Sequence, residues 1–483
     1  MNKPPRLMRR ATPIMAKPAP AMSLPEVAPA RLAAFEILQR VADEDAYASN
    51  LLASEQYDSL SREDHGLLNE LVLGVLRWQR TLDLFIERYA QRPVNQLDRA
   101  VILALRLGLY QLRFLTRIPA HAALNESVNL VKLHDKHYAA PFVNGVLRAA
   151  TRDAETTVET LLASVPNEIA RDGFATSHPS WLLKRWQERL GVEAATQLTQ
   201  TNNTQPRTAL RLNELQAPAA QTHAWLTQHE IQTRASGLAP QALVIESGSL
   251  NGLAEPVRDG WLYIQDEASQ LVTHLAALST QAGRVLDMCA APGSKALLLA
   301  ALLPAVDIVA NDLHAHRLRT LEELRARLGV MNLLTQQYDA TLPLPKNWGQ
   351  GFDLVLLDAP CSGLGTLQRH PEIKWRVTEA KLKELASLQS SLLASAARCL
   401  KPNGVLVYAV CSTEPEEGEA VVAALRTEDS AFVDITGERL TALGLNPEDF
   451  LTDTFGARTW PHLHGCEGFF FCVLKREPLT TDH

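Results

Sequence analysis

The sequence predicts three folded domains: an all-helical bundle, then a small α+β domain, then an α/β domain with a Rossmann-like sheet. Its 483 residues are too many for a single hydrophobic core. Up to about residue 150, apolar residues recur at spacings of three and four, which indicates helices packed through one face. From residue 285 onward, short apolar runs alternate with helical stretches, which is typical of a parallel sheet.

Composition places the chain among ordinary globular proteins, with 46% hydrophobic and 21% charged residues. The net charge of −7 excludes a generally basic nucleic-acid coat, so any RNA contact must come from local basic surfaces. No apolar run reaches the roughly 20 residues of a membrane span. Residues 1–27 are rich in proline and basic residues, and we expect a disordered basic tail there. We therefore expect a cytoplasmic protein without a membrane partner.

The cysteines indicate reduced thiols and no metal site. All of them lie in the last two hundred residues, and no two of them form a Cys-x-x-Cys pair, which speaks against zinc. Their positions are Cys289, Cys361, Cys399, Cys411, Cys466 and Cys472.

Residues 28–160 are predicted to form the helical bundle, with five to seven packed helices. An amphipathic helix opens at Arg31, and a longer one spans residues 67–89. Asp98 is expected to cap a strongly apolar helix that runs to Leu112. The leucine and aromatic stripes of these helices form the predicted core.

Residues 161–258 are predicted to form the small α+β domain. Residues 208–213 alternate with period two, which indicates a strand. Arg207, Arg211 and Asn213 lie at this strand and are candidates for RNA contacts, unless they belong to a solvated strand face.

Residues 259–477 are predicted to form the third domain. We expect its entry at a strand that begins at Trp261 and a following helix capped by Asp266.

The third domain is organised around the turn that follows its strand at residues 285–287. A helix is expected over residues 296–303, and the turn before it lacks both the dinucleotide fingerprint and the P-loop pattern. Small residues at a strand-to-helix turn let a ligand approach backbone N–H groups closely. We therefore expect a nucleoside ligand to bind the turn, through Cys289, Ala290, Ala291, Pro292, Gly293, Ser294 and Lys295.

Carboxylates stand at the ends of the three following strands. Asp312 ends the second strand and is placed to accept the two hydroxyls of a ribose. Asp339 follows the third strand and suits an adenine amino group, and Asp358 ends the fourth. One such acid alone is often a cap or a turn residue, but the ordered set predicts an adenosine ligand without charged phosphates. S-adenosylmethionine fits this pocket better than NAD or ATP.

Two cysteines follow neighbouring strands at the same edge of the predicted sheet. Cys361 lies just after Asp358, and Cys411 ends the fifth strand. Either cysteine alone would be a small buried hydrophobe, but the pair beside Asp358 indicates methylation at carbon 5 of cytosine. That reaction needs a thiolate that adds to carbon 6, an acid near ring nitrogen 3 and a base that removes the carbon 5 proton. Lys295, across the pocket, is placed to favour the thiolate.

Two stretches of the first domain resemble the all-helical domain of the antitermination factor NusB. They are residues 119–128, Pro-Ala-His-Ala-Ala-Leu-Asn-Glu-Ser-Val, and residues 142–148, Phe-Val-Asn-Gly-Val-Leu-Arg. The resemblance implies an RNA-binding module. Basic residues that could contact phosphates, unless they are merely solvated, are Arg77, Arg80, Arg106, Arg113, Arg117 and Lys132.

Nearly the whole chain resembles the RsmB (Sun/Fmu) family of RNA 5-methylcytosine methyltransferases. The motifs that carry this resemblance are residues 289–295, 358–365, 369–375 and 411–417. The family implies a NusB-like bundle, a small RNA-binding domain and a class I methyltransferase domain. Its implied reaction is S-adenosylmethionine-dependent methylation of cytosine 967 of 16S rRNA.

The resemblance also implies a role for individual residues. It implies that Cys411 is the nucleophile, that Cys361 assists product release, and that Asp358 meets both the donor and the cytosine. The donor is implied to bind residues 289–295, Asp312 and Asp339. The residues alone do not choose between the two cysteines.

The chain departs from the family pattern in two places. The family usually has glycine where this chain has Ser294 and threonine where it has Ala296, and Ser294 adds a Cβ near the expected donor. Near the nucleophile, Gly418 replaces the usual asparagine.

Two other functions stay open at this point: a tRNA cytosine-5 methyltransferase, and a non-catalytic RNA-binding assembly factor. We expect a monomer that acts on naked 16S rRNA or on an early small-subunit particle.

Overall fold

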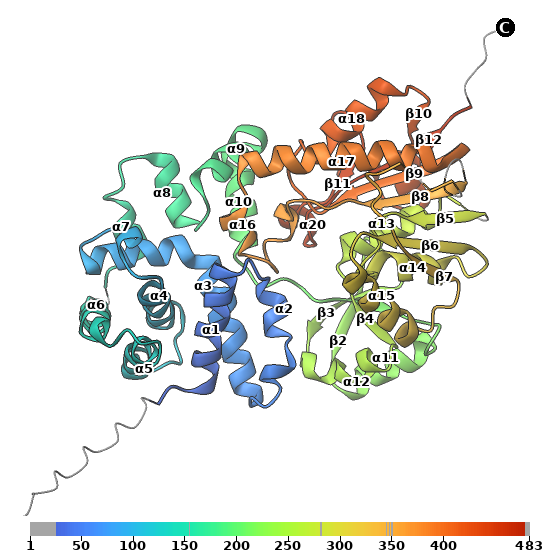
Figure 1. Ribbon diagram of the computed structural model, residues 1–483. Coiled ribbons are helices and arrows are strands. Elements are labelled where there is room, and N and C mark those ends of the chain that lie inside the picture. The colour runs from blue at the N-terminus through green and yellow to red at the C-terminus, as the bar shows by residue number, and fades with distance from the viewer. Residues whose placement is uncertain are drawn as a thin grey trace, which may run out of the picture.

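The computed structural model describes residues 26–478 apart from residues 154, 281–282, 344, 347 and 349–350. The predicted basic tail therefore lies outside the described residues except for its last two positions. Figure 1 shows a helical region at the N-terminal side and two sheets at the other side. No helix in the described part of the chain combines the length and the apolar character needed to cross a bilayer.

The helical region contains the predicted bundle and a short extension. The Asp98 side chain caps its helix as predicted, because it accepts a hydrogen bond from the Ala100 N–H at 3.0 Å. The helices are α1 (Pro29–Asp43), α2 (Ala48–Leu52), α3 (Arg62–Ala90), α4 (Arg99–Phe114), α5 (Ala120–Leu133), α6 (Ala140–Arg152), α7 (Val158–Leu162), α8 (Glu168–Ala175), α9 (Ser180–Leu190) and α10 (Val192–Asn202). One contiguous core of buried leucine, valine, alanine and aromatic side chains lies between the helices of the bundle, from α1 to α7, whereas α9 and α10 pack on residues 364–382.

Helix α3 is broken at Trp78, where φ is −103° and ψ is 16°. Backbone groups at this break bond to other elements of the chain. The Leu76 carbonyl accepts from the Trp375 indole N–H at 2.9 Å, and the Arg77 carbonyl accepts from Lys374 Nζ at 2.9 Å. The break therefore exposes carbonyl groups that tie the bundle to a segment almost three hundred residues away.

A four-stranded antiparallel sheet with order β2-β3-β1-β4 forms the small domain. Strand β4 pairs with β1, with Leu210 opposite Ile264. The strand that we expected at the entry of the third domain thus belongs to the smaller sheet, because its partner strand lies there. The elements are β1 (Ala209–Leu212), α11 (Ala219–Gln228), β2 (Gln232–Ala235), β3 (Ala242–Ser247), α12 (Ala254–Arg258) and β4 (Leu262–Ile264).

Two of the RNA contacts predicted at β1 are wrong, because the side chains are buried within the protein. Arg211 is only 3% exposed and donates to the Gln265 side chain at 2.9 Å and to the Ser294 carbonyl at 2.8 Å. Asn213 donates to the carbonyls of Gly260 and Leu328. Both residues therefore fasten the small sheet to the larger domain.

Four of the six basic residues predicted to face RNA in the bundle are also engaged inside the protein. Arg106 forms an ion pair with Asp83 at 2.7 Å, and Arg77 donates to the Gln368 carbonyl. Arg80 and Arg113 donate to carbonyl groups of neighbouring segments. The predicted phosphate-binding face is therefore not formed by this set as a whole.

The larger sheet has the order β10-β12-β9-β8-β5-β6-β7, with β11 paired to β12. Strands β5 to β9 are parallel, whereas β12 runs antiparallel to both β9 and β10. Its strands are β5 (Arg284–Asp287), β6 (Asp307–Asp312), β7 (Leu333–Gln337), β8 (Phe352–Asp358), β9 (Leu400–Val410), β10 (Phe432–Asp434), β11 (Ala457–Arg458) and β12 (Phe470–Arg476).

Helices cover both faces of this sheet, as the predicted Rossmann-like architecture requires. Helices α13, α14 and α15 contribute to the core on one face, and α17 and α18 to the core on the other. The helices are α13 (Glu267–Ala277), α14 (Ser294–Leu302), α15 (Ala315–Leu328), α16 (Ile373–Arg376), α17 (Glu379–Cys399), α18 (Glu419–Glu428), α19 (Thr436–Ala442) and α20 (Pro461–His464).

Three aspartates at strand ends lie at one edge of this sheet. Asp287, Asp312 and Asp358 are the last residues of β5, β6 and β8. Because these strands are parallel, their carboxyl ends meet at the same edge, where ligands bind in folds of this type.

Candidate active site

A cavity of about 450 Å³ opens at the carboxyl ends of β5, β8 and β9. Its volume lies within the range of about 300–1,000 Å³ that is typical of small-ligand sites. It brings together both predicted cysteines, Asp358 and part of the turn after β5. Its lining residues include Tyr47, Asn50, Cys289, Ala291, Pro292, Arg317, Asp358, Pro360, Cys361, Thr366, His370 and Cys411.

The sulfur atoms of Cys361 and Cys411 lie 3.1 Å apart. Both side chains are partly exposed to the cavity, and neither is in a disulfide. The hydrogen bond with Cys411, followed by burial, raises the pKa of the Cys361 thiol well above its usual range. Cys361 is therefore a neutral thiol beside the Cys411 sulfur.

Glu417 joins the two loops that carry the cysteines. Its carboxylate accepts the backbone N–H of Ser362 at 2.8 Å and the hydroxyls of Ser362 and Ser412, each at 2.5 Å. Gln389 on α17 donates to the same carboxylate at 3.1 Å. Each serine directly follows one of the cysteines, so this buried carboxylate fixes the distance between the two sulfur-bearing loops.

A second buried carboxylate, that of Glu414, ties the loop after Cys411 to other parts of the chain. Glu414 accepts from the Trp186 indole N–H and from Arg185, both on α9, at 2.9 Å. Arg458 donates to the backbone carbonyl of the same residue. The loop is therefore fixed by two segments, α9 and the one that carries Arg458.

Lys295 and Asp358 form an ion pair at 2.7 Å beside the cysteines. Burial opposes the charge of Lys295, but Asp358, together with the nearby Cys411 sulfur, outweighs it and raises the pKa of Lys295. In the donor-free protein Lys295 is therefore a buried, protonated ammonium group next to Asp358.

Asp287 is a buried carboxylate that the sequence analysis did not include among the ligand-binding residues. Among the described residues, neither of its carboxylate oxygens has a hydrogen-bond partner of ordinary geometry. Burial, followed by the negative charge of Asp358, raises its pKa to about 8. Its position as the last residue of a buried strand before a small-residue turn was the signal that could have identified it.

The other predicted ligand residues occupy three kinds of position. Asp312 is buried beside the cavity, where it accepts the His314 N–H at 2.9 Å and lies 3.4 Å from Arg317. Asp339 lies farther out, beyond β7, and accepts the N–H and hydroxyl of Thr341. The residues that shape the turn after β5 without lining the cavity are Ala290, Gly293 and Ser294.

Gly293 has a backbone conformation that favours glycine, with φ at +118°. A Cβ atom there would lie 2.9 Å from the Leu321 side chain. Ser294, the departure from the family pattern, begins α14, so its Cβ is accommodated at the helix start.

Comparison with known proteins agrees with this geometry. Residues 274–475 match the family described as 16S rRNA methyltransferase RsmB/F. Residues 28–152 match the NusB family, and residues 178–250 match the ferredoxin-like domain of RsmF/B-like methyltransferases.

Relatives match over almost their full length. The ribosomal RNA small subunit methyltransferase B of Shigella sonnei is 35% identical over 450 residues, which are 92% of this chain and 98% of the relative. The chain belongs to the 16S rRNA methyltransferase RsmB/F family. The enzyme of the same name from Vibrio cholerae is 34% identical over 92% of this chain and 97% of its own.

Solved structures show the same fold for this RsmB/F family chain. The crystal structure of PH0851 superposes with a TM-score of 0.76 at 23% identity, over 93% of this chain and 99% of that one. The predicted fold class is confirmed: a NusB-like helical domain, a ferredoxin-like small domain and a methyltransferase domain with a mixed sheet.

The NusB-like domain also reaches the cavity, which the sequence did not reveal. Tyr47 and Asn50 on or beside α2 line it together with His370 and Arg317 of the methyltransferase domain. Spacing within one domain gives no signal for such residues, because they lie more than two hundred positions from the other residues of the cavity.

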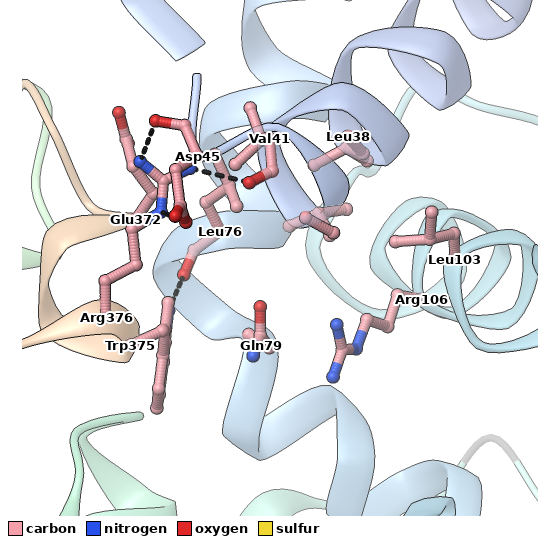
Figure 2. A pocket seen from close by; sticks show the side chains of 12 residues that line it. Leu38, Val41, Asp45, Leu76, Gln79, Leu103, Arg106, Glu372, Trp375 and Arg376 are labelled. Atoms are coloured by element: carbon pink, nitrogen blue, oxygen red, sulfur yellow. Dashed lines mark hydrogen bonds and ion pairs between the residues drawn. The ribbon is translucent and has the colours of Figure 1, made fainter. Parts of the chain in front are cut away.

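Residues 368–376, which we call the docking segment, hold the NusB-like domain in this position. Figure 2 shows Arg376 and Trp375 of this segment against α1 and α3. Arg376 donates to the carbonyls of Val41, Asp45 and Ala46 at 2.6–2.8 Å. The motif at residues 369–375 that resembled the family therefore connects two domains of the protein.

We predict that mild oxidation with diamide joins Cys361 to Cys411, because a shift of about 1 Å brings their sulfurs to the disulfide distance of about 2.05 Å. Glu417→Ala should slow this cross-linking severalfold, since the two loops lose their common acceptor. Peptide mapping of alkylated protein measures it, with Glu428→Ala on the exposed end of α18 as control. Separate alkylation of both thiols after oxidation would contradict the geometry.

Proposed function

We propose that this RsmB/F family chain methylates carbon 5 of one cytosine in 16S rRNA through a covalent cysteine adduct. Cytosine 967 is the target that the resemblance implies. The observation that carries the proposal is the meeting of two sulfur atoms 3.1 Å apart beside a buried Lys295–Asp358 ion pair. A non-catalytic assembly factor would not need this arrangement of buried, mutually supported charges.

The residues around the cavity fit S-adenosylmethionine. Asp287 supports this, because the Lys295 charge and the Cys289 N–H offset its burial only in part, and no described residue gives its carboxylate a hydrogen bond of ordinary geometry. Such a buried carboxylate is stabilised by a close, donating, positively charged group. The methionine ammonium of the donor supplies such a group. We infer that Asp287 and the turn at residues 289–295 hold the methionine part, that Asp312 takes the ribose and that Asp339 takes the adenine. When bound, the donor supplies an electrophilic methyl group.

Cys411 is the proposed nucleophile. Its sulfur attacks carbon 6 of the cytosine, and the electron pair of the ring double bond moves to carbon 5, which then takes the methyl group. Two features support a thiolate at this position: the Lys295 ammonium and the proton that Cys361 holds. The choice of Cys411 over Cys361 follows from this asymmetry as well as from the resemblance.

Cys361 is the proposed assistant in product release. The main factor that raises its pKa is its bond to Cys411, and adduct formation removes this bond because the Cys411 sulfur becomes a neutral thioether. Cys361 then ionises more readily and gives its proton to solvent, and its thiolate accepts the proton from carbon 5. The ring double bond re-forms, and Cys411 departs as a thiolate.

Asp358, paired with Lys295, is the proposed partner of ring nitrogen 3. Addition at carbon 6 places negative charge on the ring, and a proton or a hydrogen bond at nitrogen 3 stabilises it. Lys295 can pass a proton through the Asp358 carboxyl group, which it contacts at 2.7 Å, to nitrogen 3, and this proton returns to the pair when the ring double bond re-forms.

The NusB-like and ferredoxin-like domains are the proposed RNA-binding modules, at residues 28–160 and 161–258, and the methyltransferase domain at 259–477 carries the reaction. We infer that the protein acts as a monomer on naked 16S rRNA or on an early small-subunit particle. The target base must leave any stack before it can reach the sulfurs. A tRNA substrate is the remaining alternative.

Two cysteine variants should separate attack from release. Cys411→Ala should abolish methyl transfer, with a loss of at least about a thousandfold, because no other group forms the adduct. Cys361→Ala should accumulate a covalent RNA–protein adduct, seen as a band of reduced mobility in a denaturing gel. Cys399→Ala, a buried cysteine outside the cavity, is the control. The opposite pattern would exchange the roles of the two cysteines.

The substrate is tested by bisulfite sequencing of RNA from cells that lack the protein. We expect one 16S rRNA cytosine to lose protection from conversion, while tRNA cytosines stay unchanged. Reintroducing the wild-type chain should restore protection at this position, and the Cys411→Ala variant should not. Loss of protection in a tRNA alone would favour the alternative substrate.

Asp287→Asn should stabilise the donor-free protein at high pH and weaken donor binding. The pKa of Asp287 is about 8 in the folded state and about 3.9 in an unfolded chain. Between these values the folded protein binds the extra proton, so its stability falls as pH rises, and the variant lacks this fall. Thermal melts from pH 5 to 8 and calorimetric titration with S-adenosylmethionine measure both effects.

Asp307→Asn is the matched control for Asp287→Asn, because Asp307 is exposed at the opposite end of the neighbouring strand β6. Donor affinity that stays unchanged in Asp287→Asn would remove Asp287 from the proposed donor site.

A further inference from the structure

One wall of the cavity comes from the NusB-like domain and has no part in the reaction described above. Tyr47 precedes α2 and lines the cavity, yet 46% of its surface is exposed. Burial and the nearby sulfur of Cys411 raise the pKa of its phenol, so the ring lies within electrostatic range of the sulfur. Tyr47 therefore stands at the mouth of the cavity, with the cysteines farther inside.

Hydrogen bonds hold the backbone on both sides of Tyr47. Arg376 of the docking segment donates to the carbonyls of Asp45 and Ala46, directly before Tyr47, at 2.8 and 2.7 Å. On the other side, the Ala48 N–H donates to the buried carboxylate of Glu372 at 3.0 Å. A large, half-exposed aromatic side chain held from both flanks loses little conformational freedom when it binds a ligand.

Two side chains contact the Tyr47 ring. The Arg376 guanidinium lies over it, with its central carbon 6.0 Å from the ring centroid. His370 contacts Tyr47 edge-on, with centroids 5.6 Å apart and planes inclined at 78°. Among the described residues, no ring stacks in parallel on Tyr47. Burial lowers the pKa of His370 to about 4, so its imidazole is neutral at physiological pH and does not bind phosphate by charge.

We propose that Tyr47 is a stacking platform for the nucleobase next to the target cytosine, so that the NusB-like domain completes the substrate site. This inference rests on the proposed function. A cytosine that is turned out of its stack leaves its neighbour without one stacking partner, and an aromatic side chain can replace that partner. With the target at the sulfurs, the adjacent nucleotide must pass the mouth of the cavity, where Tyr47 stands.

The arrangement also gives the docking segment a function. The docking segment positions Tyr47 against the methyltransferase domain. An RNA base that stacks on Tyr47 therefore places the adjacent target cytosine near the two sulfur atoms. The ligand class is an RNA strand from which the target base has been turned out, since the neighbouring base then has a free face to offer.

The test uses the full-length protein and a 16S rRNA transcript, with dissociation constants measured alongside KM and kcat. Tyr47→Ala should raise both Kd and KM by about 5- to 150-fold, which is the effect of losing one base–aromatic stack. Tyr47→Phe should behave like wild type. Tyr47→Leu, which keeps the bulk without the aromatic face, should behave like Tyr47→Ala. The control is Tyr138→Ala, since Tyr138 is 72% exposed in the same domain and does not line the cavity.

An abasic nucleotide on either side of the target cytosine, in a short RNA, identifies the stacked base. At one of the two positions it should weaken binding of wild type by the same factor as Tyr47→Ala and should not weaken binding of that variant further. Unchanged Kd in Tyr47→Ala and Tyr47→Leu, or abasic penalties that add to those of the variants, would overturn the inference. Absence of methyl transfer by wild type on any RNA would instead refute the proposed function, while the Kd comparison would still test Tyr47.

Discussion

The buried carboxylate of Glu417 is the constraint on which the site depends. A carboxylate without solvent is stable only when donors surround it, and here four donor groups from two loops and one helix do so. Because two of the donating residues follow Cys361 and Cys411, satisfying the carboxylate also brings the sulfurs together. The requirement for hydrogen bonding thus sets the geometry that the chemistry needs.

The same principle connects the domains. The break in α3 leaves carbonyl groups at Leu76 and Arg77 that the docking segment satisfies through Trp375 and Lys374. Backbone carbonyls of the NusB-like domain find their hydrogen-bond donors in the methyltransferase domain. These bonds hold the NusB-like domain at one position against the cavity. The docking segment in this way fixes which residues of the NusB-like domain line the cavity.

The sequence predicted the site residues whose place follows from the end of a strand. It did not predict residues whose contacts depend on how deeply they are buried. Asp312, Asp358, Cys361 and Cys411 follow parallel strands, and parallel strands end at one edge, so their convergence was predictable. The role of Arg211 was not. An arginine on a strand looks like a surface cation until the strand's neighbours are known, and here they bury it against Ser294.

The sequence by itself determined the three-domain order, the strand-end acids and the pair of cysteines, because period and position along the chain carry that information. Only the tertiary structure decided that Asp287 is buried with no hydrogen bond of ordinary geometry from the described residues, and that Tyr47 reaches the cavity. Both depend on which distant segments pack together. Such contacts depend on the burial and hydrogen bonding of the whole fold, and no local pattern in the chain encodes them.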